Sequence, residues 1–204
     1  MGDDERALID RVLGGDRQAF ASLVDRYHGP LLRLAGLFVR NRAAAEEVVQ
    51  DTWIGVLEGL EGFEGRSSLK TWIFRILANR ARTRAERDAR SVPFSALAGA
   101  EGEEPAVEPQ RFDQKGHWTD APGEWDEESP EKLALRGETM AVLETAMAAL
   151  PAGQRAVLTL RDVEGMEADD ICNVLGITLT NQRVLLHRAR SKVRRALERH
   201  MRGT

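Results

Sequence analysis

A group of side chains suited to reading DNA stands near the end of the chain, directly after a short polar turn. Asn181, Gln182 and Arg183 follow the turn sequence GITLT. Amide and guanidinium groups are the ones that form paired hydrogen bonds with base edges in the DNA major groove. Residues 167–175, before the turn, have the apolar spacing of a helix, and Gly176 suits a left-handed helix end. The region therefore predicts a helix-turn-helix whose second helix reads duplex DNA.

A basic ridge is expected on a second helix, which should run from residue 69 towards residue 90. At about 100° per residue, four polar or basic side chains fall on one side of that helix: Thr71, Arg75, Asn79 and Arg82. The opposite side is apolar and consists of Leu69, Trp72, Ile73, Ile76 and Leu77. The apolar side should be buried, which leaves a polar, cationic face for an anionic partner.

The loop before this helix combines an aromatic ring with hydroxyl groups. Phe63 is followed closely by Arg66, Ser67 and Ser68. Ring stacking tolerates any base, and nearby donors can then discriminate among unpaired bases. The loop therefore suits single-stranded nucleic acid. The alternative is that Phe63 and Trp72 are core residues and that the arginines only solvate a helix face.

A third helix, expected over residues 43–60, has two unlike sides. Its apolar stripe consists of Val49, Trp53, Val56, Leu57 and Leu60. The opposite stripe is acidic with an apolar residue inside it, and consists of Glu47, Gln50, Asp51, Ile54 and Glu58. Such a mixed surface could dock on a basic helix of another protein. The alternative is a charged face that is merely solvated.

Charge is distributed in blocks, which reconciles DNA binding with a net charge of −4. Residues 66–90 hold eight basic and two acidic residues, and residues 183–202 hold eight basic and one acidic. Between them, residues 97–132 hold three basic and eleven acidic residues, together with four prolines. The prolines, glycines and acidic excess predict a flexible linker between two helical regions.

Cysteine and histidine usage and hydropathy exclude several classes of protein. Cys172 is the single cysteine, so an intrachain disulfide and a cysteine zinc cluster are both excluded. His28, His117, His187 and His200 lie far apart in sequence without ligand-like spacing, so no metal site is expected. We expect no membrane-spanning helix and no secretory signal, because no apolar run approaches about 20 residues and the first residues are acidic. We expect a soluble, cytoplasmic protein without a metal or cofactor.

Four ordered segments carry a family resemblance. They are residues 41–53 (NRAAAEEVVQDTW), 63–79 (FEGRSSLKTWIFRILAN), 150–160 (LPAGQRAVLTL) and 186–190 (LHRAR). Together they resemble a bacterial RNA polymerase sigma factor of the sigma-70 family, in the extracytoplasmic-function (ECF) group. The resemblance implies an all-α fold of two small helical domains. It places sigma domain 2 at 1–96, the flexible acidic linker at 97–133 and sigma domain 4 at 134–204.

The resemblance also implies roles for the surfaces found above. The polymerase-binding set, which would grip the clamp helices of the largest subunit, is Glu46, Glu47, Gln50, Asp51, Ile54 and Glu58. The −10 set, which would recognise and open that promoter element, is Phe63, Arg66, Ser67, Ser68, Lys70, Thr71, Arg75, Asn79 and Arg82. The −35 set is Thr178, Thr180, Asn181, Gln182, Arg183, His187, Arg188, Arg190 and Arg194.

Members of the −35 set are expected to act differently. Base edges in the groove should be contacted by Thr180, Asn181, Arg183 and His187. Gln182 is a further candidate, although many such motifs carry a buried apolar residue at its position. Arg188, Arg190 and Arg194 should contact phosphates, which set register but carry no base information.

The implied partners are core RNA polymerase, through its clamp helices and flap, promoter DNA and an anti-sigma factor. Exposed apolar residues of 135–163, with Leu158 and Val163 as candidates, would meet the flap. No small-molecule substrate and no membrane insertion are implied. The linker carries Phe112, Trp118 and Trp125, and it either threads a polymerase channel or serves as a passive tether.

Two other function classes compete with this interpretation. A helix-turn-helix regulator that acts independently of polymerase would explain 167–202 but not the acidic stripe or the Phe63 loop. An enzyme would need a nucleophile with a positioned base, and none is recognisable beside Cys172. We therefore expect no catalytic residues, and we interpret Cys172 as a small packing residue where two helices cross.

Overall fold

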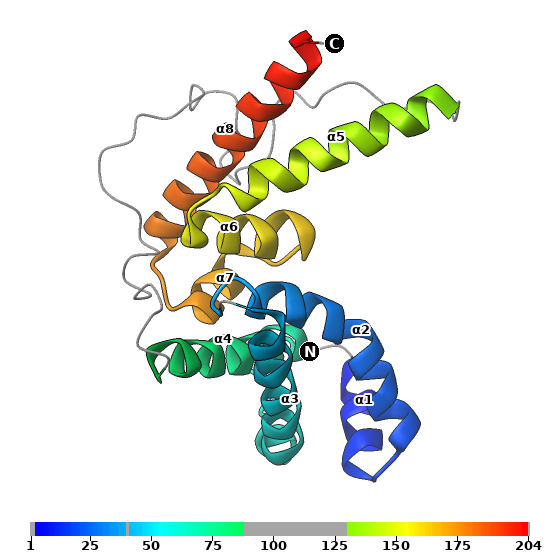
Figure 1. The fold of residues 1–204 in the computed structure, drawn as a ribbon. Helices are drawn as coiled ribbons and strands as arrows, with labels where there is room; N and C mark the ends of the chain where they lie inside the picture. The colour runs from blue at the N-terminus through cyan, green and yellow to red at the C-terminus, as the bar shows by residue number, and fades with distance from the viewer. Residues whose placement is uncertain (1–2, 40, 88–129, 204) are drawn as a thin grey trace. The chain divides into compact units, whose positions relative to one another are not determined.

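The computed structural model describes residues 3–39, 41–87 and 130–203, and in these ranges the chain is helical without a strand. The N-terminal helices are α1 (Asp3–Leu13), α2 (Arg17–Ala35), α3 (Arg42–Gly59), the short 3₁₀ helix η1 (Leu60–Gly62) and α4 (Leu69–Arg87). The C-terminal helices are α5 (Pro130–Ala148), α6 (Ala152–Leu158), η4 (Thr159–Val163), α7 (Ala168–Leu175) and α8 (Leu179–Gly203). Figure 1 shows the order of the elements. The predicted all-α fold class is confirmed.

The described helices gather into two compact units. The first contains α1, α2, α3, η1 and α4 together with the segment 159–179, which includes η4 and α7. The second contains α5, α6 and α8 from residue 180 onward. Most of the expected linker, with Phe112, Trp118 and Trp125, lies outside the described residues.

Side-chain caps set where the N-terminal helices begin. Asp16 precedes α2 and accepts hydrogen bonds from the backbone N–H groups of Gln18 (2.9 Å) and Ala19 (3.1 Å). The bond from Ala19, followed by that from the Arg11 side chain, lowers the pKa of Asp16 below its ordinary value. Asn41 caps α3 in the same way, through the N–H of Ala44 at 2.8 Å. These bonds satisfy N–H groups that the first turn of a helix leaves without a partner.

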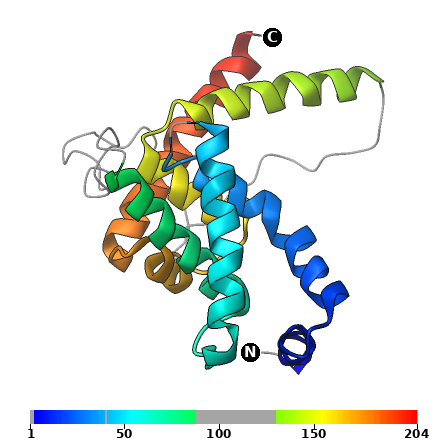
Figure 2. The same cartoon turned by 60° about the horizontal axis from the view of Figure 1, so that its bottom comes forward.

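The core of the first unit forms where α2, α3 and α4 meet (Figures 1 and 2). The largest fully buried side chains of α2, η1 and α4 are Leu23, Leu31, Leu34, Leu60, Leu69, Ile73, Phe74 and Leu77. Phe20 of α2 meets Trp53 of α3 edge to face, with ring centroids 5.7 Å apart. This core fixes how α3 and the loop after it approach α4.

Proline commonly ends a helix, but Pro30 does not. Instead α2 continues through Pro30 as far as Ala35. A proline inside a helix costs about 3 kcal/mol, because it removes one hydrogen bond and crowds the preceding turn. Leu31 and Leu34, directly after it, are completely buried. Burial of each such side chain contributes about 1.5–3 kcal/mol, so together the two offset the cost.

The helical stretch from Ala152 to Val163 is divided. It is α-helical as α6 up to Leu158, and residues Thr159–Val163 then form a π-helical turn, η4. The N–H of Glu164 bonds to the carbonyl of Thr159, five residues earlier, at 2.9 Å. The helix α5 starts at Pro130, and proline is tolerated in a first turn.

Candidate functional site

The loop between η1 and α4 carries the aromatic residue of the predicted −10 set. The N–H of Phe63 bonds to the carbonyl of Leu60 at 3.1 Å, which closes the 3₁₀ turn before the loop. Gly65 has a φ of 69°, a left-handed conformation that residues with a Cβ rarely adopt. Phe63 lies partly exposed against Trp72, and the two ring centroids are 5.0 Å apart. The loop therefore presents a ring supported from behind by α4.

One hydroxyl group and one carboxylate group hold the first turn of α4. Ser68 Oγ accepts from the N–H of Thr71 at 3.1 Å and lies 2.8 Å from the Thr71 hydroxyl. Glu5, from α1, accepts from the N–H of Leu69 at 2.8 Å. Ser68 is thus the cap of α4. The contribution of Glu5 leaves no sequence signal, because it lies 64 residues before Leu69.

The basic ridge is only partly as predicted. Arg75 and Asn79 are exposed on α4, in keeping with the expected orientation. Thr71 is 2% exposed and its hydroxyl is engaged with Ser68, so the structure does not present it to a ligand. The position is buried because the first turn of α4 packs into the unit between Leu69 and Ile73, which are buried themselves.

Lys70 and Arg82 have protein partners within the first unit. Lys70 Nζ donates to the backbone carbonyl of Glu164 and lies 3.5 Å from the Glu164 carboxylate. Arg82 donates to the carbonyl of Leu175 at 3.3 Å. Each cation thus already uses at least one of its N–H donors within the protein, so a DNA phosphate would have to share the group with these partners.

The polymerase-binding set lies along one side of α3. Glu47, Gln50, Asp51 and Glu58 are exposed, and Ile54 is 53% exposed in their midst. Two of the acids are paired: Glu46 with Arg42 at 2.8 Å, and Glu47 with Arg84 of α4 at 2.6 Å. The mixed acidic and apolar stripe expected from the sequence is therefore present as one continuous helix face.

Leu57 is a member of this surface that sequence reasoning missed. It was expected in the core stripe with Trp53 and Val56, but its side chain is 50% exposed. Leu57 lies three residues after Ile54, so both lie on the same side of α3. An exposed pair of large apolar residues among acids is better suited to a protein partner than to solvent. No sequence signal distinguished it, because Leu57 lies four residues after the buried Trp53 and therefore fits the core stripe.

The turn of the predicted helix-turn-helix has the expected backbone. Gly176 ends α7 with φ 67° and ψ 37°, the left-handed conformation for which glycine is suited. Its N–H bonds to the carbonyl of Cys172 at 2.8 Å, and the N–H of Ile177 bonds to the same carbonyl at 3.2 Å. The following helix, α8, begins at Leu179.

The residues of the predicted −35 set differ in how exposed they are on α8. Thr178, Thr180 and Arg183 are exposed, and Asn181, His187, Arg188 and Arg194 are partly exposed. Gln182 is 2% exposed and Arg190 is 4% exposed, so the structure presents neither one to DNA. Both lie on the side of α8 that also carries the buried Leu185, Leu186, Ala189 and Val193.

Val184 lies on the exposed side of α8 and is not in the predicted −35 set. It is 40% exposed and lies four residues after Thr180 and three before His187. An exposed apolar side chain on a reading helix suits the methyl group of thymine. Burial, and secondly the charge of Arg188, lower the pKa of His187 below its ordinary value of 6.5, which favours the neutral ring at neutral pH.

Three further features are the single cysteine, clusters of metal-ligating side chains and helices able to cross a membrane. Cys172 is partly buried, and burial, followed by the charge of Asp169, raises the pKa of its thiol. Within 3–39, 41–87 and 130–203, no three His, Cys, Asp or Glu side chains gather as metal ligands would. Helices in the same ranges include none with the length and apolar character needed to cross a membrane.

Two family models match the chain, one in each predicted domain. Residues 23–91 match Sigma-70 region 2, and residues 140–193 match Sigma-70, region 4. The first match contains α3, the Phe63 loop and all of α4, and the second contains α7 and most of α8.

Similar curated proteins carry related names. An RNA polymerase sigma-H factor of Pseudomonas aeruginosa is 31% identical over 96% of this chain and 95% of its own length. An ECF RNA polymerase sigma-E factor of Haemophilus influenzae is 28% identical over 95% of each chain. The corresponding Escherichia coli K12 protein is 27% identical over 93% of this chain and 92% of its own.

Solved structures share the fold. The structure of CnrH in complex with the cytosolic domain of CnrY has a TM-score of 0.57 and 23% identity, covering 96% of this chain and 98% of that chain. The sigma factor RpoE from Bartonella quintana, in complex with the anti-sigma factor NepR, has a TM-score of 0.56 and 21% identity, covering 88% and 96%. At these identities the likeness concerns the fold alone.

Proposed function

The chain belongs to the sigma-70 family of bacterial RNA polymerase sigma factors, and from that membership we propose that it binds core RNA polymerase and directs promoter recognition and DNA opening. It would do so through three surfaces: one side of α3 for polymerase, the Phe63 loop with α4 for the −10 element, and the first turns of α8 for the −35 element. The polymerase would supply the chemistry of transcription, and this chain would catalyse no reaction.

The mixed face of α3 is the observation that carries the proposal. Gln50, Asp51 and Glu58 surround the exposed apolar pair Ile54 and Leu57. Exposed apolar side chains supply contact area, and the acids around them favour a basic partner and disfavour DNA. A regulator that acts without polymerase would have no use for this surface. The polymerase clamp helices are the partner that the family implies.

Opening of the −10 element would rely on capture of unpaired bases. Phe63 offers a ring, and the loop beside it offers hydroxyl and guanidinium donors through Ser67 and Arg66. Unstacking costs a few kcal/mol per base. Stacking on an aromatic residue returns about 1–3 kcal/mol per base. Capture therefore offsets a large part of the cost, and Arg75 and Asn79 would hold the adjoining backbone.

Recognition of the −35 element would rely on the exposed side of α8. Thr180, Arg183, Val184 and His187 follow one another at helical spacing and share that side. Each good bidentate base contact contributes about 1–3 kcal/mol of discrimination. Arg188 and Arg194 would contact phosphates and contribute salt-dependent affinity without base preference. Two tethered DNA-binding regions would also raise each other's effective concentration on the promoter.

Regulation and location follow from the same membership. Control by an anti-sigma factor is proposed because a solved relative of the same fold is a sigma factor in complex with one. A cytoplasmic location is proposed because core polymerase and promoter DNA are there.

Co-purification with core polymerase tests the proposed function directly. Tagged full-length chain is mixed with core polymerase and promoter-free buffer, and the complex is isolated by size exclusion. We expect a one-to-one complex. Binding to promoter DNA without any binding to core would favour the independent helix-turn-helix regulator instead.

A further inference from the structure

The first residue of α4 is held by a residue of α1. Glu5 Oε1 accepts a hydrogen bond from the backbone N–H of Leu69, with 2.8 Å between oxygen and nitrogen. That N–H lies in the first turn of α4 and has no carbonyl partner within the helix. A carboxylate placed there also faces the positive end of the helix dipole. The bond is therefore charge-assisted and stronger than a neutral one.

The loop 63–68 is flanked by α1 at both of its ends. At the N-terminal end, α1 contacts η1, whose last residue Gly62 directly precedes Phe63. At the C-terminal end, Glu5 holds Leu69, which directly follows Ser68. The helix α1 therefore contacts the elements directly before and directly after the loop, and in this way constrains both of its ends.

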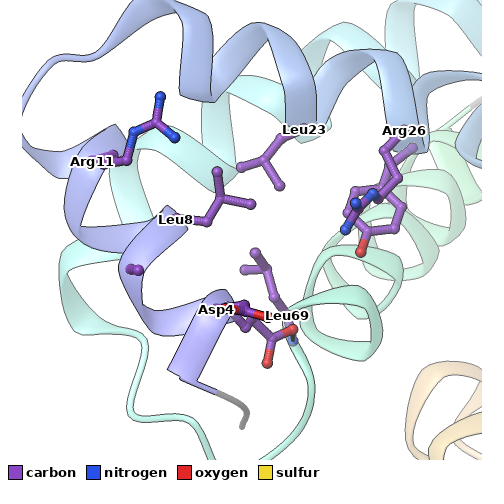
Figure 3. Close-up of a pocket in the computed structure, with 9 residues that line it drawn as sticks. Asp4, Leu8, Arg11, Leu23, Arg26 and Leu69 are labelled. Carbon is purple, nitrogen blue, oxygen red and sulfur yellow. Dashed lines mark hydrogen bonds between the residues drawn. The ribbon is translucent and has the colours of Figure 1, made fainter.

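A pocket that is partly open to solvent lies beside this bond (Figure 3). Its volume is about 520 Å³, and α1, α2 and the start of α4 all line it. Leu8, Leu23 and Leu69 point towards the same space in Figure 3. The Glu5 bond is a directional link between α1 and the start of α4 beside this pocket.

We propose that Glu5 is a positioning residue for the −10 loop. By holding the N–H of Leu69, it keeps the loop in the geometry in which the Phe63 ring and its neighbouring donors capture an unpaired base. Glu5 acts through Leu69 and does not itself contact DNA. The inference rests on the proposed function, because it assigns Glu5 a part in promoter opening.

The test uses the full-length chain reconstituted with core polymerase, on a promoter fragment that wild-type holoenzyme selects from genomic DNA. The variants are Glu5→Ala, which removes the acceptor, and Glu5→Gln, which keeps an amide oxygen at the same reach. Asp10→Ala is the matched control, since Asp10 is an exposed acid on the same helix. Three quantities are measured: affinity for core, permanganate reactivity of unpaired thymines, and hydrogen exchange of the Leu69 amide.

We expect Glu5→Ala to lower the open-complex signal about 10-fold, to speed exchange at Leu69 and to leave core affinity unchanged. Glu5→Gln should restore opening to within about 2-fold, because it restores the hydrogen bond but not the charge. Asp10→Ala should match wild type. Normal opening by Glu5→Ala, or loss of opening together with loss of core binding, would overturn the positioning role. Failure of wild-type chain to open any promoter would instead overturn the proposed function.

Discussion

The ring of Phe63 rests on the ring of Trp72, with centroids 5.0 Å apart and planes inclined by 46°. Trp72 is itself confined on another side, because a Cβ added at Gly59 would lie 3.1 Å from its ring. The end of α3, the loop and α4 are thus coupled through one indole. A base that stacks on Phe63 would meet a ring whose position is already determined by the core.

Replacement of Phe63 by alanine should impair promoter opening without affecting polymerase binding. Loss of one stacking platform costs about 1–3 kcal/mol, which corresponds to an open-complex yield about 5- to 150-fold lower. Permanganate reactivity of unpaired −10 thymines measures the yield. Leu13→Ala is the control, because Leu13 is also a partly exposed apolar residue but lies on α1. Equal yields from Phe63→Ala and wild type would show that the ring is only structural.

Charge reversal at Asp51 should weaken binding to core polymerase. Asp51 is exposed in the acidic stripe of α3, and an arginine there would oppose a basic partner surface. Like charges brought together across an interface cost several kcal/mol, so we expect affinity for core to fall at least about 10-fold. Fluorescence anisotropy with labelled chain reports the affinity. Asp25→Arg, on α2, introduces the same charge change at another exposed site and should leave it unaltered. If both variants bind equally well, the clamp surface lies elsewhere.

Two arginines of α8 should have separable effects on DNA binding. Arg183→Ala removes a base contact and should cost about 1–3 kcal/mol on the preferred −35 sequence, with relaxed preference at one base pair. Asn181→Ala should likewise weaken −35 discrimination. Arg194→Ala should weaken binding about equally on all sequences and reduce the slope of affinity against salt concentration. Competition binding with a set of single-base −35 variants, repeated at several salt concentrations, distinguishes the two behaviours. A changed sequence preference in Arg194→Ala would mean that α8 lies in the groove in another rotation.

The thiol of Cys172 should react slowly at neutral pH. Burial, followed by the negative charge of Asp169, raises its pKa above the ordinary value of 9.0. The thiolate is the reactive form, so a raised pKa leaves less of it at any given pH, and alkylation should reach half its maximal rate only above pH 9.0. Because the chain has a single cysteine, the iodoacetamide labelling rate reports this residue alone. Rapid labelling near pH 7 would point to a redox-active thiol.

The elements that sequence periodicity describes well are those with one buried and one exposed side. The face of α3 that carries Gln50 and Asp51 could be placed because each neighbour follows the helical repeat. The exposure of Leu57 could not be predicted, because periodicity does not distinguish an apolar residue next to a buried stripe from a member of that stripe. Pro30 is a related case, because the burial that carries α2 through it is contributed by other helices and leaves no local pattern.

The remaining differences arise from contacts that are distant in sequence or that depend on helix rotation. The bond between Glu5 and Leu69 joins residues 64 positions apart, and neither residue type alone indicates it. Gln182 reads as a base-contacting amide by chemistry, yet it is buried because of the rotation of α8. The packing of α8 determines its rotation about its own axis. Because Gln182 is polar, it interrupts the apolar pattern that would otherwise identify the buried side.

Run-off transcription is the most direct measurement of the central claim, that this chain brings core polymerase to specific promoters and opens them. Purified core polymerase, with and without the full-length chain, is supplied with fragments of genomic DNA, and the transcripts are mapped. We expect transcripts that depend on the chain and that start at a common distance from shared −35 and −10 sequences. Transcripts that are the same with and without the chain would contradict the claim.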